Sequence, residues 1–358
     1  MRIALVHDWL TGMRGGERVL DALCELYPDA ELFTLVHARG SVCARIEQRI
    51  VHTSALQWLP GAARRYREFL LFFPTLIEQF DFDRFDLVIS SSHCVAKSVV
   101  VPDRARHVCY CHTPMRYAWD QFEVYFGPPR LGPVQYRLMK RAMARMARWD
   151  RDTADRVGTY VTNSQHVAGK IRRYYNREAT VVYPPVDTDF FQPGPDDARS
   201  GQPFALVVSA LVPYKRLEIA VDACRLARVP LVVAGEGPER ARLERRANGG
   251  VRFVGRRSDD EIRDWYRRAS VVLMPGEEDF GIVPLEAQAC GTPVVALARG
   301  GALETVVRGE TGALVDDASA EAFADAIART IDRGVDRGVL RAHAERFSRA
   351  RFVDQMRA

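Results

Sequence analysis

The sequence predicts an α/β fold made of two doubly wound domains, each a parallel sheet covered by helices on both faces. Its 358 residues are more than twice the usual domain length of about 150 residues, so two cores are expected. Short apolar runs alternate with helical patterns along the whole chain, which is typical of parallel sheets. Residues 191–203 are rich in turn formers and predict a linker, so we place the boundary near residue 190, between domains of residues 1–190 and 191–358.

Each domain is expected to contain its own set of strands. Apolar runs in the first half predict strands at residues 3–7, 31–36, 87–90, 108–111 and 157–162. Runs in the second half predict strands at residues 181–183, 204–209, 231–234, 251–254, 271–274 and 294–298. Parallel sheets bind ligands at the carboxyl ends of their strands, so the two domains are expected to present these edges to a common cleft.

Composition and charge restrict the class of protein. Apolar residues make up 47% and charged residues 27% of the chain, which is typical of a globular protein. A net charge of +5, from 51 basic and 46 acidic residues, is too dilute over this length to indicate nucleic-acid binding. Seven irregularly spaced cysteines, no signal-like stretch at the N-terminus and no apolar run of about 18 residues predict a cytoplasmic protein.

Residues 274–293 carry the strongest functional signal. A strand leads through a loop into a helix expected to begin near Pro284, since proline suits the first turn of a helix. The backbone amides of Gly281, Ile282 and Val283 would then be uncommitted donors at a helix N-terminus, where phosphate groups bind. The segment therefore predicts an anion site.

Two glutamates, Glu278 and Glu286, flank this anion site. A carboxylate has two acceptor oxygens and can hold a pair of neighbouring hydroxyls, so one glutamate could bind a ribose and the other a hexose, with phosphates between them. The alternative is two solvated carboxylates, which is the commoner case for an isolated pair. Basic and glycine-rich segments elsewhere in the chain favour the sugar-nucleotide interpretation.

These other segments lie at predicted strand ends. Lys215 and Arg216 follow a buried strand and open a helix, which could present two cations to a diphosphate. Gly15 and Gly16 precede an amphipathic helix, and paired glycines let a backbone approach a ligand closely. The alternative for Lys215 and Arg216 is a basic helix start at the protein surface. The Gly15–Gly16 segment lacks the three-glycine spacing of a nicotinamide-dinucleotide site, which disfavours a dehydrogenase.

Several short segments accompany these residues. They lie at residues 7–10, 15–18, 112–114, 161–164, 183–187 and 212–216. With the two glutamates seven residues apart and their Phe-Gly and Gly-Thr-Pro context, they resemble family 4 of the glycosyltransferases, retaining enzymes of the GT-B fold. The resemblance extends from residue 3 to about residue 307. Within the family the set is most similar to mannosyltransferases that build bacterial O-antigens and exopolysaccharides.

The resemblance implies a role for each matching residue of the second domain. Glu278 would bind hydroxyls of the donor sugar, and Glu286 would bind the nucleotide ribose. The amides of residues 281–283 would bind the distal phosphate. Lys215, with a contribution from Arg216, would neutralise the diphosphate as it leaves.

The remaining implied roles concern both domains. The glycine pair would approach the phosphate and sugar from the first domain, and His112 would lie beside the transferred sugar. Arg256 would lie near the base. The sequence departs from the family at Ala210, where an arginine is usual, which leaves more of the diphosphate charge to the lysine. The last helix, near residues 341–351, would pack back on the first domain.

On this resemblance the chain is a hexosyltransferase with Glu278, Lys215 and His112 as its catalytic residues. It would transfer a hexose, with mannose from GDP-mannose favoured, to a glycan or polyprenyl diphosphate-linked glycan in polysaccharide synthesis, with retention and without metal or cofactor. The alternatives are a UDP-sugar donor, a sugar-nucleotide epimerase or phosphorylase of the same architecture, and a sensor that binds sugar nucleotides without turnover.

A basic helical segment suggests where the acceptor is met. Residues 130–156 contain eight basic and three acidic residues, and residues 64–73 join cations to a bulky apolar run. Such elements can lie on an anionic membrane surface. The alternative is ordinary packed helices with solvated arginines. We therefore expect a peripheral contact with the cytoplasmic face of a membrane, and no nucleic-acid partner.

Overall fold

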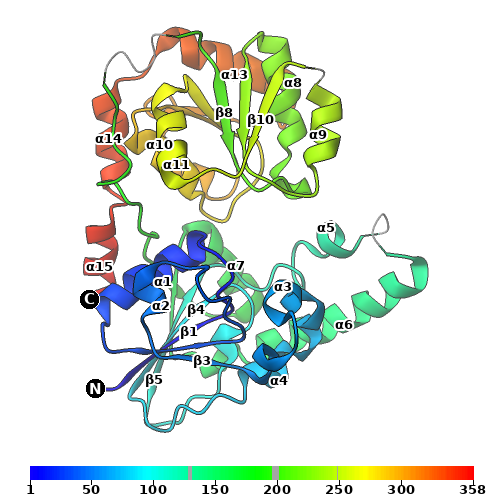
Figure 1. The fold of residues 1–358 in the computed structure, drawn as a ribbon, viewed down its shortest axis with the longest axis vertical. Helices are drawn as coiled ribbons and strands as arrows, with labels where there is room; N and C mark the ends of the chain where they lie inside the picture. Colours follow the sequence, from blue (N-terminus) through cyan, green and yellow to red (C-terminus); the bar gives the residue numbers. More distant parts are fainter. Residues whose placement is uncertain (128–130, 196–200, 248) are drawn as a thin grey trace. The chain divides into compact units, whose positions relative to one another are not determined.

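The computed structural model describes residues 1–127, 131–195, 201–247 and 249–358. The chain divides into two compact units, one of Met1–Pro185 with Phe352–Ala358 and one of Val186–Arg351. Each unit is a parallel sheet with helices on both faces (Figure 1). Of the predicted linker, residues 191–195 and 201–203 lie in the second unit, and residues 196–200 lie outside the described residues.

The first unit is built on a seven-stranded parallel sheet. Its strands lie in the order β3-β2-β1-β4-β5-β6-β7, so the direction of strand addition reverses between β1 and β4. The strands are β1 (Ile3–His7), β2 (Glu31–Thr34), β3 (Val51–Thr53), β4 (Leu87–Ser92), β5 (Arg106–Cys111), β6 (Thr159–Thr162) and β7 (Ala179–Val181). The α-helices are α1 (Gly15–Leu26), α2 (Ala44–Glu47), α3 (Ala62–Arg65), α4 (Phe73–Ile77), α5 (Phe122–Phe126), α6 (Pro133–Asp152) and α7 (Gln165–Tyr175).

The second unit repeats this plan with six parallel strands. The order is β10-β9-β8-β11-β12-β13, and the reversal falls between β8 and β11. The strands are β8 (Ala205–Val208), β9 (Leu231–Ala234), β10 (Val251–Gly255), β11 (Val271–Met274), β12 (Val294–Leu297) and β13 (Gly312–Val315). The α-helices are α8 (Leu217–Ala227), α9 (Arg240–Ala247), α10 (Asp259–Arg268), α11 (Ile282–Ala289), α12 (Ala302–Thr305), α13 (Ala320–Arg333) and α14 (Arg337–Glu345), followed by α15 (Arg349–Arg357), which ends in the first unit. The two sheets confirm the predicted doubly wound α/β fold.

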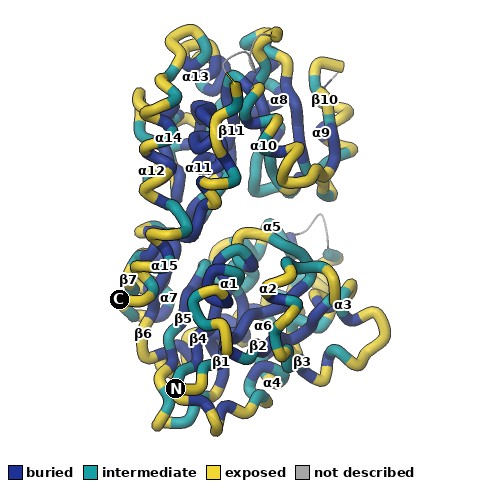
Figure 2. Tube along the Cα trace, turned by 60° about the vertical axis from the view of Figure 1, so that its left-hand side comes forward, coloured by how far each residue is buried: buried dark blue, intermediate teal, exposed yellow. Residues whose placement is uncertain are grey.

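Apolar burial holds each sheet between two helical layers, and Figure 2 shows the central strands buried in both units. In the first unit, Leu5, Ile89 and Tyr110 face α1 in one cluster. Phe352 of α15 joins the same cluster, with its ring 5.8 Å from that of Tyr110. Alternate residues of the same strands, such as Val88, face the opposite layer. Burial on both faces explains why these strands read as continuous apolar runs.

Several helix boundaries follow from local side-chain chemistry. The Ser164 hydroxyl accepts a hydrogen bond from the Val167 amide at the start of α7. Ser258 and Glu261 form a reciprocal capping box at the start of α10. These bonds satisfy amides that have no partner within the helix. At the end of α7, Asn176 takes a left-handed φ of +53°, which ends the helix.

The structure differs from the sequence-based expectation at several elements. The strand expected in the second set at residues 181–183 is β7, Ala179–Val181, at the edge of the first sheet. The edge strands β3 and β13 were not predicted, since they are short and incompletely buried. Phe191, expected in the linker, is 1% exposed and packs against Tyr266 of the second unit.

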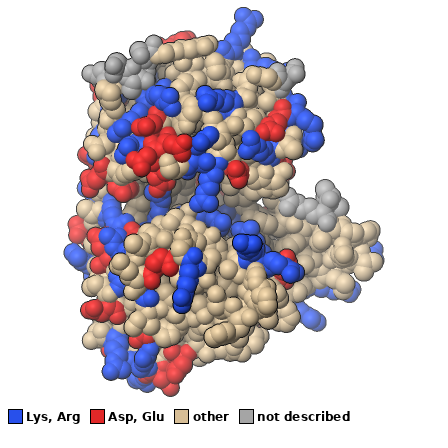
Figure 3. All heavy atoms as spheres, viewed as in Figure 1, with Lys and Arg blue, Asp and Glu red and all other residues tan. Residues whose placement is uncertain are grey.

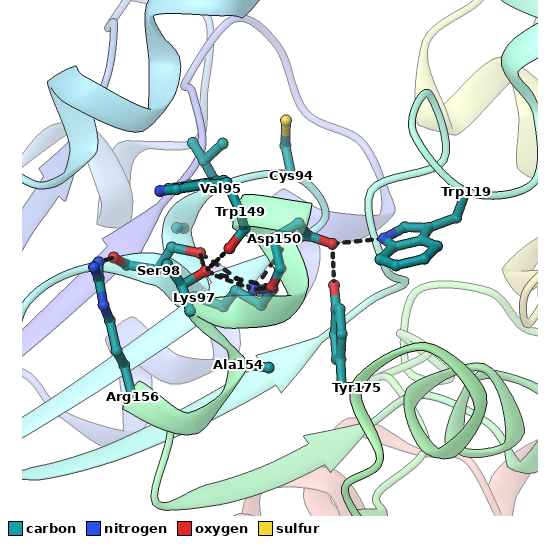
Figure 4. A network of polar contacts seen from close by, with 12 residues as sticks. Cys94, Val95, Lys97, Ser98, Trp119, Trp149, Asp150, Ala154, Arg156 and Tyr175 are labelled. Atoms are coloured by element: carbon teal, nitrogen blue, oxygen red, sulfur yellow. Dashed lines mark hydrogen bonds and ion pairs between the residues drawn. The ribbon is translucent and has the colours of Figure 1, made fainter. Parts of the chain in front are cut away.

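A buried polar network fixes the C-terminal end of α6 to the loop after β4 (Figure 4). The Lys97 ammonium lies 3.1 Å from the Asp150 carboxylate, and both side chains are at most 1% exposed. The other carboxylate oxygen accepts hydrogen bonds from Trp119 Nε1 at 2.7 Å and from the Tyr175 hydroxyl at 2.8 Å. Lys97 Nζ also donates to the Asp150 carbonyl at 2.6 Å. Burying a charge pair is tolerated because its polar atoms find partners.

Helix α6 projects from the rest of the first unit (Figure 1). Within the described ranges, no helix is both long and apolar enough to cross a membrane.

Candidate active site

Both units place polar residues where the strand order of the sheet reverses. In the second unit this point lies between β8 and β11, and the segments after these strands carry Lys215 and Glu278. In the first unit it lies between β1 and β4, whose ends carry His7 and Ser91. Open parallel sheets bind ligands at this point because the loops from the two adjacent strands run to opposite faces and leave a crevice.

An ion pair joins Lys215 and Glu278. Lys215 ends a 3₁₀ turn, η6 (Pro213–Lys215), and its ammonium contacts the Glu278 carboxylate. The two side chains are 18% and 15% exposed, so the pair is largely buried but reaches the surface. Lys215 Nζ also lies 5.2 Å from the centroid of the Tyr214 ring. The structure thus brings together two of the three predicted catalytic residues.

Close backbone contacts hold the loop that carries Glu278. The Glu278 backbone carbonyl accepts a hydrogen bond from the Gly301 amide at 2.8 Å. A β-carbon at Gly301 would lie 2.2 Å from the Phe280 carbonyl oxygen, and one at Gly276 would lie 2.7 Å from Lys215 Cα. Both positions require glycine, because another part of the backbone passes where a side chain would begin. The loop and the η6 turn are therefore held against each other.

The N-terminus of α11 lies next to this loop. The helix begins at Ile282, two residues before the predicted start at Pro284, and its N-cap is Gly281 with a left-handed φ of +88°. Gly281 has no side chain that could cap the helix. The first amides of a helix have no carbonyl one turn back to bind, so the amides of Ile282 and Val283 can donate to an anion.

Glu286 lies further along α11 and is 5% exposed. The hydroxyl of Tyr266, which is fully buried, donates to Glu286 Oε2 at 3.0 Å. A buried carboxylate needs such a partner, and this one restricts the rotamers of the glutamate. The structure therefore orients Glu286 by a residue that the sequence analysis did not identify.

The other predicted residues of the second unit have different surroundings. Arg216 takes a left-handed φ of +51°, and its guanidinium donates to the Ala318 carbonyl at 3.4 Å. Arg256 follows β10 and is exposed. Ala210 is also exposed. Of the two adjacent cations, Lys215 is the one that pairs with Glu278.

In the first unit, His112 and Gly16 lie together. His112 follows β5, and its Nε2 lies 2.9 Å from the Ser91 hydroxyl oxygen. A β-carbon at Gly16 would lie 3.6 Å from the same nitrogen, whereas one at Gly15 would meet no atom within 4 Å. The start of α1 therefore covers one side of the His112 ring with backbone alone.

A buried group beside His112 was missed by the sequence analysis. His7 Nδ1 lies 3.1 Å from the Ser91 oxygen, and His7 Nε2 lies 3.7 Å from Glu17 Oε1. Burial raises the pKa of the Glu17 carboxyl, but the neighbouring His7 ring outweighs this effect, so the pKa of Glu17 falls below its ordinary value. The signal available in the sequence was the run of serines at the end of an apolar strand.

Asp8 organises the loop on the other side of this group. Its buried carboxylate accepts hydrogen bonds from four consecutive backbone amides, those of residues 93–96, at 2.6 to 3.0 Å. His93 Nδ1 lies 3.1 Å from the same carboxylate. Burial lowers the pKa of His93 below its ordinary value, although Asp8 opposes this effect. Asp8 therefore has a structural role, which accounts for a buried acid at the end of β1.

Across the described ranges, no three histidine, cysteine, aspartate or glutamate side chains are grouped so that they could hold a metal ion.

Two units with the same reversed strand order, each with polar residues at the reversal, define the GT-B class of fold. Residues 13–190 match the family model described as glycosyltransferase family 4, and residues 190–349 match the model described as glycosyl transferases group 1. The chain therefore belongs to the group 1 and family 4 glycosyltransferases.

Curated relatives share part of the chain. A D-inositol 3-phosphate glycosyltransferase of Mycolicibacterium smegmatis is 35% identical over 188 residues, which are 46% of this chain and 42% of that protein. A protein of the same name from Kribbella flavida is 37% identical over 203 residues, which are 48% of this chain and 47% of that protein. The chain spans less than half of the length of these relatives.

Solved structures share the fold over the whole chain. Anabaena HepE in complex with UDP aligns with a TM-score of 0.74 and 19% identity, covering 100% of this chain and 98% of that chain. Sucrose-phosphate synthase from Thermosynechococcus elongatus aligns with a TM-score of 0.71 and 19% identity, covering 99% and 97%. At this identity the likeness concerns the fold.

Proposed function

We propose that the protein transfers a hexose from a nucleotide sugar to a hydroxyl of a glycan acceptor. The observation that carries this proposal is the Lys215–Glu278 pair beside the N-terminus of α11, in a chain of this family. A cation and helix amides suit a diphosphate, and a carboxylate suits sugar hydroxyls. This arrangement supports breakage of the bond between the sugar and its diphosphate.

The proposed chemistry is largely electrostatic. As the bond between the anomeric carbon and the phosphate oxygen breaks, negative charge grows on the diphosphate and positive charge on the sugar ring. Lys215 and the α11 amides would stabilise the first, and Glu278 the second. The acceptor oxygen bonds to the anomeric carbon, and its proton passes to the departing phosphate oxygen. We propose retention of configuration and no metal, as the family resemblance implies, and the anomeric configuration of the product can be read by NMR.

Two variants test this assignment. Lys215→Ala and Glu278→Ala should each lower the transfer rate at least 100-fold, the usual effect of removing one transition-state contact. Lys170→Ala is the matched control, because Lys170 also pairs with a carboxylate, that of Asp120, with 15% and 25% exposure. Thermal melting establishes that each variant folds. Near-normal transfer by either site variant would overturn the proposal.

The donor is proposed to be GDP-mannose, on the similarity of the sequence motifs to mannosyltransferases. A UDP-sugar is the second candidate, favoured by the structural neighbour HepE, which was solved with UDP and with UDP-glucose. Melting the protein with each nucleotide sugar separates them, since a ligand at 100 times its Kd stabilises the native state by about 2.7 kcal/mol. Glu286→Gln should weaken this shift for the true donor.

Helix α6 supports a proposed contact with an anionic membrane that holds a lipid-linked acceptor. Val134 and Leu138, one turn apart, are 70% and 59% exposed, and Figure 3 shows basic side chains on the projection that contains α6. Exposed cations with apolar neighbours are typical of interfacial helices. The exposed α6 cations that form no ion pair with a described residue are Arg137, Lys140, Arg141, Arg145 and Arg148.

Charge reversal tests the membrane contact. Each cation near an anionic surface contributes about 1 kcal/mol, so changing Arg137, Arg141 and Arg145 to glutamate should weaken binding to phosphatidylserine vesicles at least 100-fold. The control reverses exposed arginines elsewhere on the first unit with the same change in net charge. Equal vesicle binding by the two variants would contradict this proposal. The control arginines are Arg39, Arg104 and Arg106.

Product analysis separates the rival enzyme classes. A sugar-nucleotide epimerase would change the donor without any acceptor, and a phosphorylase would release a sugar phosphate when given inorganic phosphate. A sensor would bind the donor and leave it intact. Formation of a glycoside only when an acceptor is present is the result expected of a transferase.

A further inference from the structure

The chain passes between the two units at two places, after Pro185 and after Arg351. One side chain of the first unit, Tyr110, contacts the chain next to both of these passages. Its hydroxyl donates to the carbonyl of Val182, shortly before the first passage, at 2.8 Å. Its ring lies 5.8 Å from that of Phe352, the first residue after the second passage. Tyr110 therefore holds both segments that lead from one unit to the other.

These contacts lie in the apolar core of the first unit. Tyr110 is fully buried, Val182 and Phe352 are 4% and 1% exposed, and all three belong to the cluster that packs under α1. Burial raises the pKa of the Tyr110 hydroxyl well above its ordinary value, so the hydroxyl keeps its hydrogen and can donate it. Because the Tyr110 ring is bonded at its hydroxyl and packed edge-on by Phe352 at an interplanar angle of 69°, it has little room to move.

Tyr110 also contacts His112. Residues two apart on a strand share a face of the sheet, and the centroids of the two rings are 5.1 Å apart. The His112 backbone is fixed separately, because its amide donates to the Ser92 carbonyl at 2.8 Å. Tyr110 can therefore influence the orientation of the His112 ring, to which the Ser91 hydroxyl makes a further contact.

We propose that Phe352 and Tyr110 are positioning residues that keep the His112 ring in place for transfer, so that helix α15 completes the site of the first unit. The importance for transfer rests on the proposed function, in which His112 lies beside the transferred hexose. Without the Phe352 ring, the space that it fills would let the Tyr110 ring shift, and His112 would lose its packing on that side. A displacement of about 1 Å at a reacting group can lower a rate about 100-fold.

Proton NMR of protein labelled with ¹³C-histidine tests this packing without any substrate. An aromatic ring shifts the signals of protons close to it, so the ring protons of His112 report the position of Tyr110. Phe352→Ala should move these signals, which His112→Gln assigns. His107 is an internal reference, because it lies on the opposite face of β5, and its signals should move less. Unchanged His112 signals in Phe352→Ala would overturn the proposal.

Met356→Ala is the matched control. Met356 lies one turn further along α15 and is partly buried against the same apolar cluster, so its replacement also removes a large apolar side chain from this helix. The His112 signals should stay nearly unchanged in this variant. Equal movement of these signals in Phe352→Ala and Met356→Ala would contradict a specific role of Phe352.

Transfer measurements test whether the packing matters for the reaction. At a temperature where all variants are folded, Phe352→Ala should lower kcat about 10- to 100-fold, and Met356→Ala should change it less than about twofold. Phe352→Leu fills part of the space, so it should recover much of the rate, and it serves if Phe352→Ala does not fold. A residue that only stabilises the fold would lower Tm and leave kcat unchanged, and this result would overturn the proposal.

The outcomes separate this proposal from the proposed function. If the His112 signals move and kcat does not fall, the role of this packing in transfer is wrong. Near-normal transfer by Lys215→Ala would instead overturn the proposed function, and the spectra would still decide whether Phe352 and Tyr110 position the His112 ring.

Discussion

Replacing Lys97 by methionine should strongly destabilise the first unit. The substitution keeps most of the side-chain volume and removes the ammonium that lies 3.1 Å from the Asp150 carboxylate (Figure 4). Asp150 is fully buried and would retain its hydrogen bonds from Trp119 and Tyr175 without a compensating charge. Leaving a buried charge unpaired costs about 3–5 kcal/mol. In a unit of this size, each kcal/mol lowers Tm by about 2–4 °C, so Tm should fall by about 6–20 °C.

A double-mutant cycle distinguishes this mechanism from a general loss of packing. Asp150→Asn keeps an oxygen that can accept from Trp119 or Tyr175 but removes the charge. Combined with Lys97→Met, it removes both charges, so the double variant should be more stable than the sum of the two single effects by about 2 kcal/mol or more. Urea denaturation, followed by circular dichroism, measures the free energy of unfolding of the native protein and of each variant.

Two results would refute this reasoning. One is a cost of less than about 1 kcal/mol for Lys97→Met, which is the value expected of an exposed pair. The other is strict additivity of the two substitutions, since independent effects would mean that the two charges do not interact. Lys170→Met, at the more exposed pair with Asp120, provides the reference for a weak ion pair.

Three further predictions concern the second unit and the response to acid. Gly301→Ala should displace the loop of Glu278 and abolish donor binding, because its β-carbon would lie 2.2 Å from the Phe280 carbonyl oxygen; calorimetric titration measures this. Tyr266→Phe should weaken donor binding about tenfold, because it removes the hydroxyl that orients a carboxylate; the same titration checks it, with thermal melting to establish that the variant folds. Burial lowers the pKa of His107 from 6.5 to about 4, so the unfolded state binds more protons than the folded state between these two pH values. The free energy of unfolding should therefore fall as the pH drops from about 6.5 to about 4. His107→Gln should flatten this dependence on pH, which urea titrations at several pH values measure.

The sequence predicted the central strands because burial on both faces leaves an unambiguous signal. The runs at β9 and β11 are apolar throughout and were placed at the correct residues. The edge strands β3 and β13 pair on one side and contain partly exposed residues, so their sequences resemble loops. A strand's sequence also does not say which sheet it joins, which explains why β7 was assigned to the second set.

The functional residues also divide into those that a local sequence pattern predicts and those that come together only through the order of the strands. Glycine, proline and glutamate spacing around α11 could be read locally, because a loop and the helix that follows it are continuous in sequence. The contact of Lys215 with Glu278 spans 63 residues, and that of His7 with Ser91 spans 84. These contacts depend on β8 lying beside β11 and β1 beside β4, which follows from the order of the strands in the sheet and not from any local pattern.

The Lys215–Glu278 pair also constrains how a donor would bind. The resemblance assigns Lys215 to the diphosphate and Glu278 to sugar hydroxyls, yet in this structure the two neutralise each other. A diphosphate carries more charge than one carboxylate, so it can draw the ammonium away from Glu278 and leave the carboxylate to accept hydrogen bonds from the sugar. A nucleoside diphosphate without a sugar lacks the hydroxyls that would replace the lysine at Glu278. The pair should therefore bind a complete nucleotide sugar better than the nucleotide alone. Lys215→Ala should reduce this difference, because Glu278 would no longer exchange a lysine for the sugar hydroxyls.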